Sequence, residues 1–142
     1  MTASRLNASA LRPYALRLSP GEDLKLSLQA FTRAENLSAG CILTTVGSLR
    51  QASLRFAGQD SATVLEGPFE IVSLVGTLSQ DGLHLHLAIA DANGDTTGGH
   101  LMPGCLIHTT AEIVIGILSG FTFQRLADPQ TGFHELSIVE ED

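Results

Sequence analysis

Three histidines close together in the chain are the residues best suited to chemistry. His84 and His86 alternate within the apolar run from Leu83 to Ala90, and His100 follows directly after Gly98-Gly99. Alternate side chains of a β-strand leave the same face, so His84 and His86 are expected to lie on one face, roughly 7 Å apart. Neutral imidazole is the commonest nitrogen ligand of zinc and similar divalent ions. These three histidines therefore predict a metal site.

The position of His100 depends on how the chain returns after the first two histidines. If Asn93-Gly94 forms a two-residue type I′ turn, His100 lies opposite Leu87 and faces away from His84 and His86. A β-bulge at Gly98-Gly99, or a longer loop from Asp91 to Asp95, would shift the returning strand by one residue. The spacing leaves both devices open. It also leaves open that the histidines are ordinary polar residues of a half-buried strand.

Composition excludes some classes of partner. The chain has 142 residues, which suits one domain with its own core, and 44% of them are hydrophobic while only 16% are charged. So few charges indicate apolar surface that is hidden in an oligomer. The net charge of −7 repels a phosphate backbone. Lys25 is the only lysine, and the arginines are scattered at positions 5, 12, 17, 33, 50, 55 and 125.

The cysteines and the apolar segments indicate a cytoplasmic protein. Cys41 and Cys105 are expected to be reduced thiols, because the sequence begins without the apolar run of a signal peptide. The longest apolar stretch, Ala111 to Leu118, is interrupted by Glu112 and Gly116, so no segment is expected to span a membrane.

Hydrophobic periodicity predicts one helix followed by strands. Residues 1–12 are expected to form a flexible N-terminal arm, and residues 13–142 a single domain. After a first strand at Tyr14–Leu18, a helix should open at Pro20-Gly21-Glu22-Asp23, with Leu24, Leu28, Phe31 and Leu37 on its buried side, and end near Ser38-Ala39-Gly40. The later strands are expected at Cys41–Val46, Ser53–Ala57, Ala62–Leu65, Phe69–Leu78, Leu83–Ala90, His108–Leu118, Phe121–Leu126 and Leu136–Val139. This pattern predicts an α+β fold: a curved, mostly antiparallel sheet, partly barrel-like, with one main helix.

Several motifs in a fixed order give the chain a family resemblance. They are Gly21-Glu22-Asp23-Leu24, Thr45–Leu49 with Leu54–Ala57, Glu66–Leu78, the histidine segment through Pro103-Gly104-Cys105, and Thr110–Gly116. Together they resemble the PPC (plants and prokaryotes conserved) domain, a family also described as predicted DNA-binding proteins. The resemblance runs from about Tyr14 to Val139 and implies a homotrimer. In the plant members DNA contact comes from a separate AT-hook, and no such segment occurs here, so we expect no direct contact with DNA.

The resemblance also implies a ligand set. The histidines are similar to the zinc-binding histidines of acetolactate decarboxylase, whose fold is usually grouped with the PPC domain, and the corresponding ligands here are His84, His86 and His100. A decarboxylase also needs a group that binds the substrate carboxylate and an acid that protonates the product. Arg55 and Glu112 are the catalytic candidates. Arg55 could equally be an ion-pair partner on the surface or at an interface, and Glu112 could complete a polar pocket or bridge subunits.

The leading hypothesis is a homotrimer with a three-histidine site for a divalent metal, zinc, that acts as a small-ligand-binding or regulatory module. Its partners would be other copies of itself and a small molecule. The first alternative is a DNA-binding or transcription-associated regulator. The second is a metal-dependent lyase or decarboxylase, so the sequence leaves open whether the protein is an enzyme.

Overall fold

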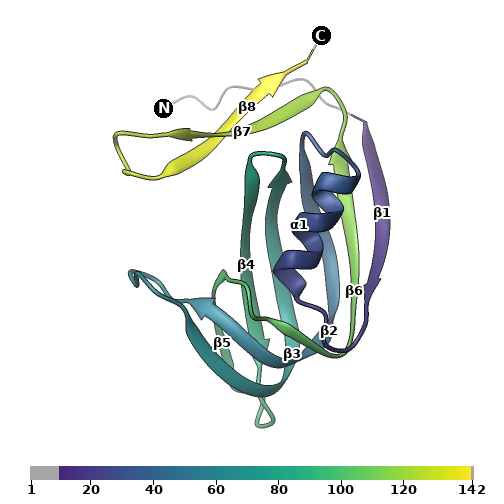
Figure 1. Cartoon of the computed structure of the whole chain (residues 1–142), viewed down its shortest axis with the longest axis vertical. Helices are drawn as coiled ribbons and strands as arrows, with labels where there is room; N and C mark the ends of the chain where they lie inside the picture. The colour runs from purple at the N-terminus through teal and green to yellow at the C-terminus, as the bar shows by residue number, and fades with distance from the viewer. Residues whose placement is uncertain (1–9, 142) are drawn as a thin grey trace.

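The computed structural model describes residues 10–141 and contains, within them, one helix and eight strands. The elements are β1 (Leu11–Leu18), α1 (Leu24–Ala34), β2 (Gly40–Arg55), β3 (Thr63–Ser79), β4 (Gly82–Ala90), β5 (Thr96–Leu101), β6 (Leu106–Leu118), β7 (Phe121–Ala127) and β8 (His134–Glu140). Figure 1 shows a strongly curved sheet with α1 packed across one face and the β7–β8 hairpin at one end.

The main sheet is antiparallel and partly closed on itself. Its order is β1-β6-β2-β3-β4-β5, and β5 also pairs with β2 through Leu54 with Leu101 and Arg55 with His100. Strands β2, β3, β4 and β5 therefore form a ring at one end of the sheet, while β7 and β8 form a separate two-stranded sheet. The prediction of a mostly antiparallel, curved and partly barrel-like sheet with one helix is confirmed.

Helix α1 supplies the cover for the core. Asp23 caps its N-terminus, with Oδ1 accepting from the Leu26 N–H at 3.0 Å and Oδ2 accepting from the Gly104 N–H at 2.7 Å. The carboxylate thereby ties the helix to the turn before β6. The leucines at 24 and 28 are fully buried, and the core they join includes Leu49, Leu54, Ile107 and Ile113 from the sheet. Removing this apolar surface from water stabilises the stacking of helix on sheet.

The helix is shorter than the sequence predicts. It starts at Leu24, so Glu22 and Asp23 precede it, and it ends at Ala34. Asn36 adopts a left-handed conformation (φ 51°), which ends the helix before Leu37. Leu37 is nevertheless 2% exposed. Its periodic position marked a core residue that lies beyond the helix rather than on it.

The strands are longer than the sequence predicts. The segments Cys41–Val46 and Ser53–Ala57 belong largely to one strand, β2, and Ala62–Leu65 and Phe69–Leu78 to one strand, β3. Gly47 lies inside β2, and Gly76 lies inside β3. At Gly47 an added Cβ would lie 2.3 Å from the Thr110 carbonyl oxygen, so this glycine permits close contact with β6.

Other predictions fall at the edges of the described structure. The N-terminal arm, residues 1–12, lies mostly outside the described residues, and Leu11 and Arg12 already belong to β1.

Cys41 and Cys105 are not paired, and burial raises the pKa of the Cys105 thiol to about 11. Within residues 10–141, α1 is too short to cross a membrane.

Candidate metal centre

The three histidines converge at the edge of the ring of strands. One ligand nitrogen from each of His84, His86 and His100 lies within 4.8 Å of those of the other two. The ring centroids are 5.0 Å apart for His84 and His86, 5.3 Å for His84 and His100, and 5.7 Å for His86 and His100. His84 and His86 come from β4, and His100 comes from β5.

The register that brings His100 into the cluster is set by the loop between β4 and β5. His86 pairs directly with His100, and Ala90 pairs with Thr96, so the loop comprises Asp91 to Asp95. Asp91 organises it, since its Oδ1 accepts from the backbone N–H of Asn93 at 2.8 Å and of Asp95 at 3.0 Å. The longer loop is therefore the device that shifts the register, and the two-residue type I′ turn is wrong.

Gly98 and Gly99 have a different role from the bulge considered for them, because the pairing of β4 with β5 runs without a register shift. An added Cβ at Gly98 would lie 2.8 Å from the Leu87 carbonyl oxygen, and one at Gly99 would lie 2.8 Å from the Arg55 carbonyl oxygen. Glycines at these positions let β5 fit between β4 and β2. The resulting contact places Arg55 directly opposite His100.

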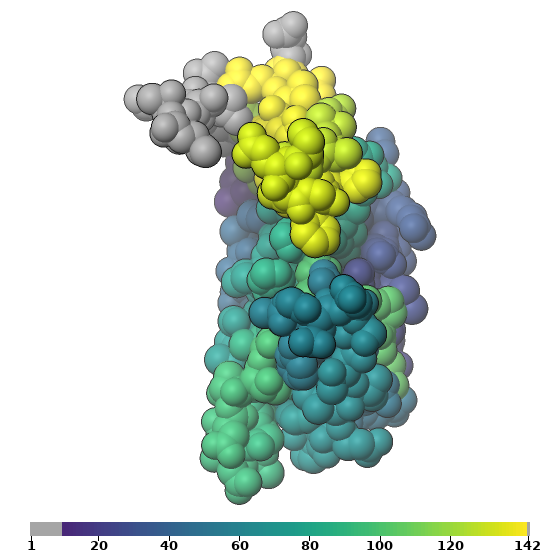
Figure 2. Space-filling view, turned by 90° about the vertical axis from the view of Figure 1, so that its left-hand side faces the viewer, coloured from purple at the N-terminus to yellow at the C-terminus, as the bar shows by residue number. Residues whose placement is uncertain are grey.

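The cluster opens into a cavity of about 840 Å³, a size typical of small-molecule sites. One wall is the turn after β2, Arg55 to Gly58, and the other includes Arg125 and the segment Phe133 to Glu135 of the β7–β8 hairpin. In Figure 2 the yellow-green tip of this hairpin lies above the blue-teal turn between β2 and β3, and the surface between them is hollowed. Asp81 to Leu83 line the cavity beside His84.

The electrostatics of the cavity keep imidazole nitrogens free for a metal. Burial, and after it the positive charge of Arg55, lowers the pKa of His100 to about 4. Burial also lowers the pKa of His84, and the charge of Arg125 adds to the effect. Neutral imidazole is the form that binds metal, so these two ligands do not need to lose a proton at neutral pH.

The donor set fits a divalent ion of the zinc type. Three imidazole nitrogens suit zinc, and donors around one tetrahedral zinc ion lie roughly 3.4 Å apart, so small rotations of these side chains would be enough. His84 and His86 are exposed. A fourth position would therefore face the cavity, as in zinc sites that bind water or a substrate.

The two catalytic candidates do not lie together. Arg55 lines the cavity with the histidines, whereas Glu112 is exposed and lines a second hollow of about 470 Å³ with His108 and Thr110. Glu112 thus lies away from the three histidines.

Arg125 also lines the cavity, although no sequence pattern marks it as a site residue. It lies on β7, and its Nη2 donates to Thr77 Oγ1 at 2.8 Å. Thr77 pairs with His84 between β3 and β4, which places the arginine beside the cluster. The only sequence signal was a single charged residue in a predicted strand, and nothing in that signal connects β7 to the histidines.

Comparison with known proteins gives a family match over most of the chain. The model of the Plants and Prokaryotes Conserved (PCC) domain matches residues 5–119. Among curated proteins, the bifunctional protein GlmU of Synechococcus sp. (strain JA-3-3Ab) is 53% identical over 94% of this chain, which spans only 21% of that protein. AT-hook motif nuclear-localized protein 20 of Arabidopsis thaliana is 29% identical over 87% of this chain, and 46% of that protein is covered.

Solved structures show the same fold. A hypothetical protein from Salmonella enterica is 48% identical, with a TM-score of 0.92, over 94% of this chain and 97% of that one. A metal-containing protein from Archaeoglobus fulgidus is 26% identical, with a TM-score of 0.77, over 96% of this chain and 99% of that one. The fold of the whole described chain is thus shared with proteins of similar length.

Proposed function

Since the chain belongs to the Plants and Prokaryotes Conserved (PCC) domain family, we propose that it binds a divalent metal ion, zinc, through His84, His86 and His100 and presents it to a small molecule in the adjoining cavity. The observation that supports this most directly is the convergence of three imidazole nitrogens within 4.8 Å at the edge of that cavity. In this role the protein is a small-ligand-binding or regulatory module.

Two relatives support the proposal. The similar protein from Archaeoglobus fulgidus is described as metal-containing. In the Synechococcus GlmU, the region similar to this chain makes up about a fifth of a bifunctional protein. Attachment of such a domain to a larger protein suits a module that senses or binds a small molecule.

The chain's own residues have separable roles in this function. The three imidazoles would hold the ion, and the short turn from Arg55 to Gly58 and the β7–β8 hairpin would enclose the molecule bound next to it. A bound zinc ion supplies a Lewis acid that polarises an oxygen of its ligand. Glu112 lies outside this cavity, so we give it no part in chemistry at the ion, and the lyase or decarboxylase hypothesis loses the acid it relied on.

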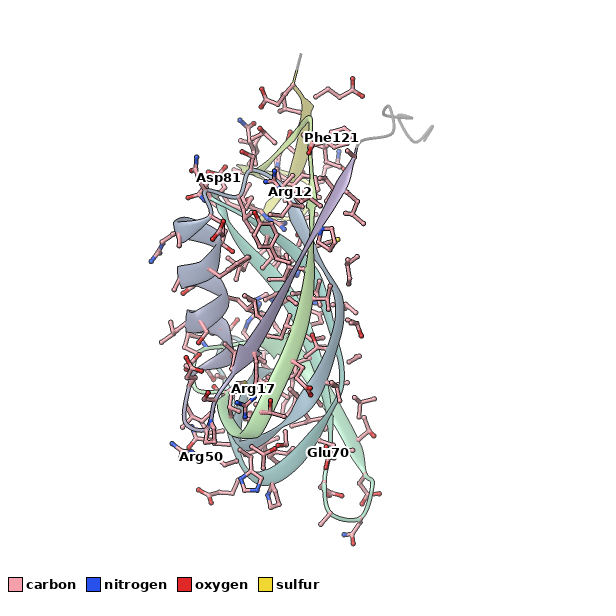
Figure 3. All side chains as sticks on the ribbon, turned by 90° about the vertical axis from the view of Figure 1, so that its right-hand side faces the viewer. Arg12, Arg17, Arg50, Glu70, Asp81 and Phe121 are labelled. Carbon is pink, nitrogen blue, oxygen red and sulfur yellow. The ribbon has the colours of Figure 1, made fainter. Side chains whose placement is uncertain are left out.

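Contact with DNA has less support in this chain. The plant relative is named for its AT-hook motif. Here the basic residues of the described structure are spread along the molecule: Arg12 lies towards one end near Phe121, and Arg17 and Arg50 lie towards the other (Figure 3). A stripe of positive charge that could follow a phosphate backbone does not form from them.

We extend the proposal to a homotrimer. Large hydrophobic side chains are exposed on the neighbouring strands β2 and β3, namely Leu43 at 46%, Val46 at 59%, and Val72 and Val75 at 55% each. Packing against other copies of the chain would cover them. The number three rests on the family resemblance.

Metal analysis of purified protein tests the metal site. Protein supplied with zinc and then freed of excess should contain one zinc ion per chain by elemental analysis. His84→Ala and His100→Ala should each lose most of it, because removing one of three ligands from a shared site weakens it severely. His108→Ala is the matched control, since His108 is exposed and lies outside the cluster. Zinc-free wild-type protein, or full zinc content in His84→Ala, would overturn the proposal.

A further inference from the structure

The cavity beside the three histidines is a place of positive charge in an acidic protein. The chain has a net charge of −7, yet two of its seven arginines, Arg55 and Arg125, line this one cavity. We propose that these two arginines bind the anionic group of the small molecule that occupies the cavity, and that this molecule is a small dianion with carboxylate or phosphate oxygens. The inference rests on the proposed function and specifies its ligand.

Arg55 reaches the cavity from the His100 side. It pairs with His100 between β2 and β5, so the two side chains leave the same face of the ring. Its Nη1 donates to the Gln59 carbonyl oxygen at 3.3 Å, a long bond to a neutral acceptor. Within residues 10–141 no carboxylate forms an ion pair with it. A guanidinium has five N–H donors, so most of those of Arg55 remain free for a ligand.

Arg125 reaches the cavity from the His84 side. Its Nη2 donates to Thr77 Oγ1 at 2.8 Å, and its backbone N–H donates to Asp81 Oδ2 at 3.1 Å. The first bond fixes the direction of the side chain, and the second fixes β7 against the turn before β4. Neither bond neutralises the guanidinium. The two arginines therefore flank the histidines from two different strands, with no ion-pair partner among the described residues.

The charges that line the cavity do not balance once a divalent ion is bound. Two guanidiniums and the ion give four positive charges, while the carboxylates of the lining, Asp81 and Glu135, give two negative charges. Both carboxylates already accept hydrogen bonds, Asp81 from the Arg125 backbone and Glu135 from Thr131 Oγ1 at 2.9 Å. An excess of two positive charges in a recessed site favours a ligand with two negative charges. Arginine binds planar carboxylates and phosphates through paired hydrogen bonds, which gives such a ligand a defined orientation.

Calorimetric titration of zinc-loaded protein tests the assignment. Malonate and inorganic phosphate are the two probes, and the one that binds more tightly indicates whether carboxylate or phosphate oxygens are preferred. We expect Arg55→Gln and Arg125→Gln each to weaken binding of the preferred probe about tenfold, the effect of removing one charge-assisted hydrogen bond. Arg50→Gln is the matched control, because it makes the same charge change on β2 but lies outside the cavity lining. Its affinity should equal that of the wild type.

Zinc content measured on each variant separates this inference from the proposed function. Retained zinc with unchanged anion affinity in both arginine variants, or no binding of either probe, overturns the inference and leaves the metal site standing. If the wild type holds no zinc, the proposed function fails. The inference then fails with it, because the excess of two positive charges includes the ion.

Discussion

At the scale of single residues, His100 is the histidine whose pKa lies furthest from its ordinary value. It lies between Arg55, its neighbour across β2 and β5, and the other two histidines. Burial is the larger cause of its low pKa, and the nearby guanidinium acts in the same direction. The site therefore favours the neutral form of the histidine that joins β5 to the cluster, which is the form able to bind a metal ion.

The low pKa of His100 leads to a prediction about acid. Between the ordinary value of 6.5 and about 4, the unfolded chain binds a proton at His100 that the folded chain does not. The free energy of unfolding of the metal-free protein should therefore fall as the pH drops through this window, and the contribution is fully present only above 6.5. Urea unfolding at several pH values should show a smaller acid-induced loss in His100→Gln than in the wild type. A titration of His100 by NMR with a midpoint near 6.5 would contradict this account.

The sequence predicts the relative positions of side chains when the whole pattern lies within one strand. The alternation of His84 and His86 predicts that both lie on one face of the strand, and in the structure their rings lie side by side. Arg125 had no comparable signal, because its position depends on the packing of the β7–β8 hairpin near β3 and β4. The spacing of residues along the chain does not predict such a contact between distant segments.

At the scale of elements, the three-histidine site depends on the placement of β5. It pairs with β4 on one side and β2 on the other, and Gly98 and Gly99 remove the side chains that would keep these strands apart. The sequence did show that something must shift the return strand, but it could not choose between a bulge and a longer loop. The choice depends on Asp91, whose carboxylate satisfies two backbone N–H groups of the loop and so outweighs the turn preference of Asn93-Gly94.

Gly99→Ala tests the importance of the closed ring. The new Cβ would lie 2.8 Å from the Arg55 carbonyl oxygen and 3.4 Å from Phe56 Cδ1, so β5 would have to move away from β2. Overpacking of this kind costs about 1–3 kcal/mol, and urea unfolding should show a loss of that size. Because Arg55 would be displaced from His100, anion affinity should also fall. Thr97→Ala on the same strand is the control and should change both quantities little. A variant as stable as the wild type would show that the ring does not need this close contact.

At the scale of the whole molecule, net charge governs which polymers can approach. The chain has 15 acidic and 8 basic residues, and the positive charge of the cavity is confined to a recess. We therefore predict no sequence-specific binding of duplex DNA by this chain alone at physiological salt. Electrophoretic mobility or anisotropy measurements over a range of salt concentrations would check it. A submicromolar complex that weakens steeply with added salt would overturn the prediction and revive the regulator hypothesis.

The exposed apolar surface of β2 and β3 leads to the last prediction, which concerns assembly. Leu43, Val46, Val72 and Val75 lie exposed on two neighbouring strands of a chain with only 16% charged residues, so a monomer would leave this patch in water. We expect purified protein to scatter light as a trimer of about 45 kDa, three times the chain mass of 15.0 kDa.

Two substitutions separate assembly from folding. Val75→Asp places a charge on the exposed patch without entering the core, so it should break the trimer while the chain stays folded by circular dichroism. Ile71→Asp, at a buried position on the same strand, should instead unfold or aggregate the chain. If the wild type is a well-behaved monomer at micromolar concentration, the patch needs no second copy to cover it and the trimer is wrong. If Val75→Asp remains a trimer, the copies meet through another surface.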